Sequence, residues 1–106
     1  MDHDPDYVTK DSPWPVAHTV NRLTTLMAER GMTIFAVIDQ RAAARGAGQE
    51  LRDTTLIIFG NPAVGTSIMN SEPLAGLDLP LKVLVWDNGG LTRASYVSPT
   101  VLATRY

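Results

Sequence analysis

The stretch Thr54–Asp87 decides the fold of this chain. It opens with the apolar run Thr55–Phe59 (TLIIF), breaks at Gly60–Pro62, and passes through a loop, Ala63–Pro80, into a second apolar run, Leu81–Trp86 (LKVLVW). Both runs are short, rich in strand-forming residues and bounded by turn residues, a pattern typical of buried β-strands. We interpret the rest of the chain as segments that either pack against these two strands or connect them.

The segment that follows predicts a β-hairpin and a terminal helix. Asp87–Gly90 (DNGG) supplies residues that tolerate positive φ angles, as a tight hairpin turn requires, and Thr92–Val97 is the returning strand. A turn this short joins antiparallel strands. Ser98 and Pro99 fit the N-cap and first position of a short helix, Thr100–Arg105.

The segment before residue 31 predicts an edge strand and one amphipathic helix. Tyr7–Lys10 is short and reads as the edge strand. Ser12 is a suitable N-cap with Pro13 at the first helical position, so we expect a helix over Pro13–Arg30, ended by Gly31. Its apolar stripe has three- and four-residue spacing and consists of Val16, Val20, Leu23 and Met27, widened by Leu26.

Between these parts lie a third strand and short helical segments. Thr33–Ile38 is the third strand, with apolar residues on both of its sides. Arg41–Arg45 is prone to form a helix, and Thr66–Asn70 fits one or two helical turns. The expected fold class is α+β, with a single antiparallel sheet of about five strands, two helices on one face and the order β-α-β-β-β-β-α.

Length and composition restrict the function. The 106 residues make one domain, 1–106, in which residues 1–5 are expected to be a frayed tail. There are no cysteines, and the net charge is −2 without a basic cluster, so we expect no nucleic acid partner. No apolar run is long enough to span a membrane, and the acidic N-terminus is unlike a signal peptide, so we expect a cytoplasmic protein without a membrane partner.

The three main strands are apolar on both faces. In a sheet with one solvent-exposed face, the apolar residues occupy every second position of each strand. Two modest helices can cover only one face of the sheet. Burying each large side chain on the other face is worth about 1.5 to 3 kcal/mol, so we expect a homodimer that covers this face. The alternative is that the 63–80 loop folds back across it.

Two motifs resemble the domain-of-unknown-function 302 family. They are Phe59–Thr66 (FGNPAVGT), joined to Leu74–Trp86, and Thr33–Asp39 (TIFAVID), followed by alanines; Ser95-Tyr96 and the terminal Pro99 helix also fit. The resemblance runs over nearly the whole chain from about residue 7. It implies a TATA-binding-protein-like fold with a curved antiparallel sheet and two helices, implies dimers, and implies no biochemical activity. Gln40 stands where the family usually has histidine, so the resemblance does not carry a role of that imidazole, as base or metal ligand, over to this chain.

The candidate ligand-binding residues are polar or aromatic and lie in or beside the deciding stretch: Asn61, Thr66, Asp78, Lys82 and Trp86. Gly60–Ser67 has the glycine spacing of a phosphate-binding loop, but Thr66 replaces the essential lysine, so a glycine turn or a weak anion site is the interpretation. Lys82 interrupts an apolar strand, so we expect its side chain to snorkel toward water, to pair with an acid such as Asp78, or to line a pocket. Two histidines and no thiols predict neither a metal site nor a cofactor.

These observations leave three functional hypotheses. The first is a small dimeric protein that is not an enzyme and binds a small or apolar ligand between helix and sheet. The second is an interaction module whose exposed groove takes a protein partner. The third is an enzyme that uses Asp78, Lys82 and Asn61.

Overall fold

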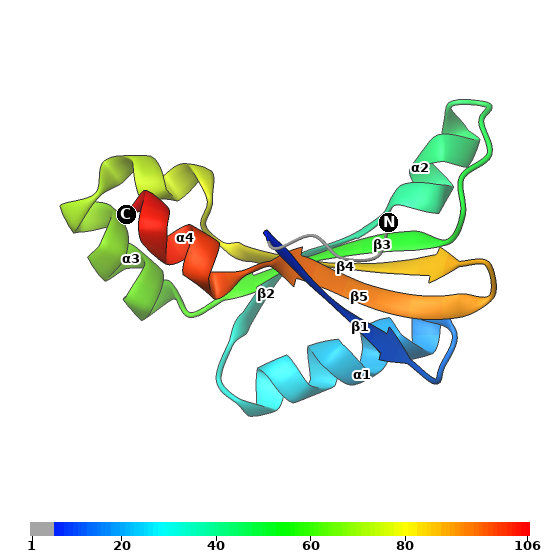
Figure 1. Cartoon of the computed structure of the whole chain (residues 1–106), viewed down its shortest axis with the longest axis horizontal. Coiled ribbons are helices and arrows are strands. Elements are labelled where there is room, and N and C mark those ends of the chain that lie inside the picture. Colours follow the sequence, from blue (N-terminus) through cyan, green and yellow to red (C-terminus); the bar gives the residue numbers. More distant parts are fainter. Residues whose placement is uncertain (1–5) are drawn as a thin grey trace.

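A computed structural model describes residues 6–106, and the tail predicted over residues 1–5 lies outside this part. One five-stranded sheet forms the centre of the molecule, in the order β1-β5-β4-β3-β2, with every neighbouring pair antiparallel (Figure 1). The α+β class and the antiparallel sheet are therefore confirmed. The strands are β1 (Tyr7–Ser12), β2 (Thr33–Asp39), β3 (Thr54–Gly60), β4 (Leu81–Asn88) and β5 (Leu91–Val97).

The two predicted organising strands are neighbours within this sheet. β3 and β4 pair in a register that sets Ile57 opposite Val83 and Leu56 opposite Leu84. The hairpin between β4 and β5 is also confirmed, with Gly89 and Gly90 at φ angles of 62° and 96°. Among the described residues β1 pairs with β5 alone and forms one edge of the sheet, as expected of an edge strand.

Helix α1 (Val16–Glu29) lies along one face of the sheet (Figure 1). Its buried residues Val16, Val20 and Met27 belong to one hydrophobic cluster, together with Ile57, Val83 and Val85 of the central strands. Leu23, the other member of the predicted stripe, packs against that cluster. The predicted stripe is thus the side of α1 that faces the core, and Gly31 follows the helix with a φ angle of 76°.

The predicted start of this helix at Ser12 and Pro13 is wrong. Ser12 ends β1 opposite Thr92, and the helix begins at Val16 with Pro15 as its N-cap. A residue that precedes proline is disfavoured in the helical region, which favours the extended backbone of Ser12 at the end of β1. The Ser12 hydroxyl instead lies 2.7 Å from the Thr19 hydroxyl and ties the end of β1 to α1.

The remaining helices lie at the ends of the sheet, so one helix rather than two runs along a face (Figure 1). α2 (Gln40–Gly46) begins at Asp39, whose carboxylate accepts from the Ala42 amide at 2.9 Å. α3 (Pro62–Ser71) is longer than predicted and starts four residues earlier, because Asn61 and Pro62 supply its N-cap and first position. It gathers with the 3₁₀ helix η1 (Pro73–Leu77) and α4 (Pro99–Arg105) at the opposite end from α2.

The second face of the sheet is not covered by a helix of the described residues (Figure 1). Strand pairing places Ala36 and Ile38 of β2 on the same face as Leu56 and Ile58 of β3, and Leu84 and Trp86 of β4 share it. We call these six residues the open face. Most of them are half-buried, and Ile38 is 37% exposed. The segment 63–80 does not fold across the open face, because its helices stand at the end of the sheet.

Candidate functional site: a groove between α1 and the sheet

The α1 side of the sheet contains a groove of about 620 Å³. A helix with its side chains is about 10 Å wide, whereas five strands span about 19 Å between the outer pair. α1 packs mainly over β2, β3 and β4, so it covers the part of this face formed by β5 and β1 less closely. The groove follows from this mismatch in width.

The walls of the groove are largely apolar. Leu23, Leu26 and Met27 contribute from α1, and α4 closes the far end with Pro99 and Leu102. The strands supply the floor with a larger set: Phe59, Leu81, Val83, Ala94, Tyr96 and Val97. Leu26 is 46% exposed, so this part of the helix turns a large hydrophobic side chain toward open space.

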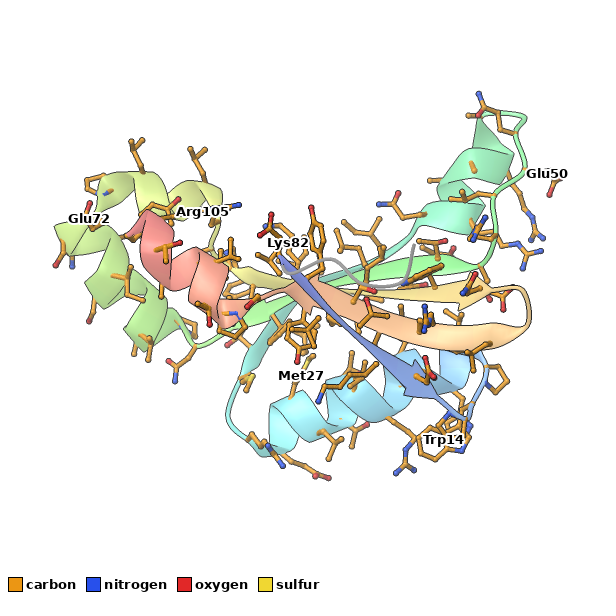
Figure 2. The ribbon with its side chains drawn as sticks, viewed as in Figure 1. Trp14, Met27, Glu50, Glu72, Lys82 and Arg105 are labelled. Carbon is orange, nitrogen blue, oxygen red and sulfur yellow. The ribbon has the colours of Figure 1, made fainter. Side chains whose placement is uncertain are left out.

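An aromatic and a cationic side chain mark the other end of the groove, near the start of α1. The rings of Trp14 and His18 are 5.2 Å apart and tilted by 30°, and the Arg22 guanidinium lies 4.1 Å from the Trp14 ring centroid. His18 and Arg22 are four residues apart on the helix, which places both over the same ring. Figure 2 shows Trp14 below the sheet, on the same side of it as Met27. Trp14 is thereby held at the mouth of the groove.

Asp78 joins the groove to the C-terminal helix. Its carboxylate accepts from Arg105 at 2.8 Å and from the Tyr106 hydroxyl at 2.5 Å, and that hydroxyl also lies 3.2 Å from the Leu74 carbonyl oxygen. The hydrogen bonds from Tyr106 and Arg105 lower the pKa of Asp78, and the same carboxylate raises the pKa of Tyr106. Beyond α4 lies a second cavity of about 560 Å³ that Pro99 and Leu102 also line.

The structure separates the five predicted site residues. Asn61 caps α3 by accepting from the amides of Ala63 and Val64, and Thr66 is exposed on the same helix. Neither of them lines the groove, whereas Asp78 and Lys82 border it. Trp86 lies on the open face, where its indole nitrogen donates to the Ser95 hydroxyl at 3.0 Å and the Arg52 guanidinium stands 6.0 Å from its ring.

The predicted ion pair between Lys82 and Asp78 is wrong. The carboxylate of Asp78 pairs with Arg105, which is 27 residues away in the chain. Lys82 pairs with Ile58 across the ladder, so its side chain shares the open face, and Figure 2 shows it on the opposite side of the ribbon from Met27. Within residues 6–106 no hydrogen bond links Asn61, Asp78 and Lys82 to one another.

Sequence reasoning missed most residues of the groove, above all Trp14, Leu26 and Tyr96. One signal was present, because Leu26 widens the apolar stripe of α1 beyond what a single seam against the sheet needs. The groove itself depends on how far the helix is offset from the β1 edge. No local pattern encodes that offset.

The amino-acid sequence is similar to those of known proteins. A fluoride-specific ion channel FluC 1 of Brucella suis is 39% identical over 104 residues, which are 97% of this chain and 41% of that protein. FluC 1 of Brucella abortus is also 39% identical, over 38% of its length, so this chain spans about two fifths of these curated relatives. Within residues 6–106, no helix has both the length and the hydrophobicity that crossing a membrane requires.

A solved structure shares the fold. The uncharacterized conserved protein DUF302 from Bacillus stearothermophilus superposes with a TM-score of 0.87 at 20% identity, over 96% of this chain and 80% of that one. The model of the family described as "Domain of unknown function DUF302" matches residues 8–106. The resemblance in the two motifs is therefore confirmed, and the chain belongs to the DUF302 family.

Proposed function

We propose that this protein binds a small ligand with an apolar body in the groove between α1 and the sheet. The observation that carries the proposal is a cavity of about 620 Å³ lined mainly by apolar side chains. Sites for small molecules are concave, mostly apolar and about 300 to 1,000 Å³ in volume, so the size and the lining both fit. We place this activity in the cytoplasm as part of the proposal.

The arrangement of the groove supports a binding role. Its walls come from α1 and from the strands, and the hydrophobic cluster packs these elements against one another. The aromatic rings of Trp14, at the mouth of the groove, and Tyr96, in its floor, offer large contact areas. Asp78 borders the groove, and its carboxylate is paired with Arg105 and Tyr106.

A neutral apolar dye, N-phenyl-1-naphthylamine, tests the proposal. We expect its fluorescence to rise on addition of the protein and to fall when Leu26→Trp fills the groove from α1. The matched control is Leu77→Trp, because Leu77 is 77% exposed and does not line the groove. Equal dye binding by the two variants, or none by the wild type, contradicts the proposal.

We propose further that two copies of the chain associate through the open face. The open face presents six apolar side chains from three adjacent strands, and no helix of the described residues lies along it. A contiguous apolar patch on a protein surface often marks an interaction site. A second copy fits because a two-fold dimer sets the same patch against itself, apolar surface on apolar surface.

Light scattering with two matched variants tests the homodimer. Leu84→Asp puts a carboxylate in the middle of the open face and is expected to give a monomer at micromolar concentration. Val64→Asp adds the same charge on α3, where the side chain is 56% exposed, and is expected to leave the dimer intact. A monomeric wild type overturns the homodimer and leaves the open face for a different protein partner.

A second candidate function is an association with fluoride transport. The relatives from Brucella are named fluoride-specific ion channels, and more than half of each lies outside the match. Fusion of two domains in one chain often joins domains that act together, which suggests that this domain serves beside a channel. Deletion of the gene is then expected to make cells more sensitive to fluoride, and growth in fluoride unchanged by the deletion argues against this candidate.

A further inference from the structure

We infer that the ligand of the groove is an amphiphile with an anionic head, which Lys10 and Arg22 hold at the rim. This inference rests on the proposed function, because it assigns the chemistry of a ligand in the same groove. It follows from where the uncompensated charges stand around an otherwise apolar cavity. The remaining lining residues bind the apolar body.

The hydroxyl contact between Ser12 and Thr19 fixes the geometry of this rim. At 2.7 Å it ties β1 to α1 and closes one corner of the groove. The next residue on the same side of β1 is Lys10, which stands opposite Ala94 in the sheet. On α1, one turn beyond Thr19 is Arg22. Two cationic side chains therefore extend from two different walls, just beyond the point where the walls meet.

The negative charges at the groove are already compensated. Asp11 forms an ion pair with Arg93 at 3.0 Å, and Asp78 pairs with Arg105 and Tyr106. The side chain of Lys10, by contrast, makes no ion pair or hydrogen bond within residues 6–106. Arg22 contacts the ring of Trp14 and no carboxylate in the described part of the chain. The free charge around the cavity is positive, which complements an anion.

The side chains have the form that this role requires. Lysine and arginine lay their aliphatic stems along apolar surface and keep the charged end at its border. Lys10 and Arg22 are both exposed and both line the groove, so each end can reach a head group beside the cavity. An Arg22 guanidinium stacked on Trp14 is held in position before the ligand arrives. The ligand class is thus a single chain with a carboxylate or another anionic head.

Calorimetric titration with three chain-matched compounds tests the inference. We expect decanoate to bind at least about tenfold more tightly than decyltrimethylammonium, with decanol between them; tenfold corresponds to about 1.4 kcal/mol. The preference of decanoate over decanol should shrink in high salt, because exposed charges are screened. Equal affinities for the three compounds, or a preference for the cation, overturn the anionic head but leave the apolar groove in place. Failure of all three to bind removes the proposed function itself.

Variants of the rim residues test whether Lys10 causes the preference for an anionic head group. Lys10→Gln is expected to lower the affinity for decanoate about threefold to tenfold and to change the affinity for decanol by less than about twofold. Lys10→Arg is expected to retain the wild-type affinity for both. Arg45→Gln is the charge-matched control, since Arg45 is exposed on α2 and does not line the groove. A loss of decanoate affinity in Arg45→Gln equal to that in Lys10→Gln contradicts a local site. Binding to phosphatidylglycerol vesicles without binding of monomeric decanoate also overturns the inference, because the anion is then a bilayer surface.

Discussion

The hydroxyl oxygen of Tyr106 lies 2.5 Å from a carboxylate oxygen of Asp78 and holds the end of α4 against the residue that follows η1. Arg105 reaches the other oxygen of the same carboxylate at 2.8 Å. Two consecutive side chains thus fasten α4, whose Leu102 separates the groove from the second cavity. We call this contact the α4 fastening.

Removing the phenolic hydroxyl should loosen α4 without unfolding the sheet. In Tyr106→Phe we expect faster amide hydrogen exchange at Val101 and Leu102, whose amides bond back to Ser98, because local opening costs less free energy. Tyr7→Phe is the control, since Tyr7 is 54% exposed on β1 and takes no part in the fastening. Unchanged exchange in α4 would show that the Asp78 contact does not hold the helix.

The α4 fastening should depend on pH in two directions. The pKa of Asp78 is lowered in the folded protein, so its stabilising effect is present above about pH 4 and is lost as the pH falls through the lowered value. The pKa of Tyr106 is raised, so its effect is present below about pH 10 and is lost above. We expect hydrogen exchange in α4, corrected for the intrinsic pH effect, to be slowest relative to β4 between these limits. In Asp78→Asn the increase of α4 hydrogen exchange at low pH should disappear. If that increase persists in the variant, a group other than Asp78 causes it.

The buried cluster under α1 predicts where truncation is most harmful. Ile57 is fully buried between α1 and the sheet, so Ile57→Ala should lower the free energy of unfolding by about 2 to 5 kcal/mol. Val64→Ala, at a residue that is 56% exposed, should change it by less than about 0.5 kcal/mol. Urea denaturation of both variants measures the difference, and similar midpoints would place the core elsewhere.

The β4–β5 hairpin depends on left-handed backbone at Gly90, where the φ angle is 96°. A side chain in this conformation is strained, so Gly90→Ala should destabilise the protein by about 1 to 2 kcal/mol. Gly46→Ala is the matched control, because Gly46 ends α2 without a positive φ angle and its added methyl group meets nothing within 4 Å. Thermal unfolding should separate the two variants, and a stability in Gly90→Ala equal to that of Gly46→Ala would contradict the turn geometry.

Much of the fold follows from local patterns. The strands around Ile57, Val83 and Phe35 are readable because each is a short apolar run between turn residues, and the hairpin because Gly89-Gly90 demands a tight turn. The start of α1 was not readable in the same way. The Ser12–Pro13 pair fits a helix cap locally, but pairing of β1 with β5 keeps Ser12 extended, and that pairing joins residues about 80 positions apart.

The candidate site was less accessible to sequence reasoning for the same reason. The partner of Asp78 is Arg105, not the nearby Lys82, because strand pairing turns Lys82 to the open face. The groove is created by the lateral position of α1 over the sheet, a tertiary property. The two-sided strands did predict an uncovered apolar face, and the structure has one, whereas the association of two copies stays a prediction.

The fluorescence of Trp14 on ligand addition tests the binding groove most directly. In a Trp86→Phe variant all tryptophan emission comes from Trp14 at the mouth of the groove, and we predict a saturable change in it as decanoate is added. In the reciprocal Trp14→Phe variant, Trp86 reports from the open face and its emission should not change. A change that follows Trp86 rather than Trp14, or no saturable change in either variant, would contradict the account.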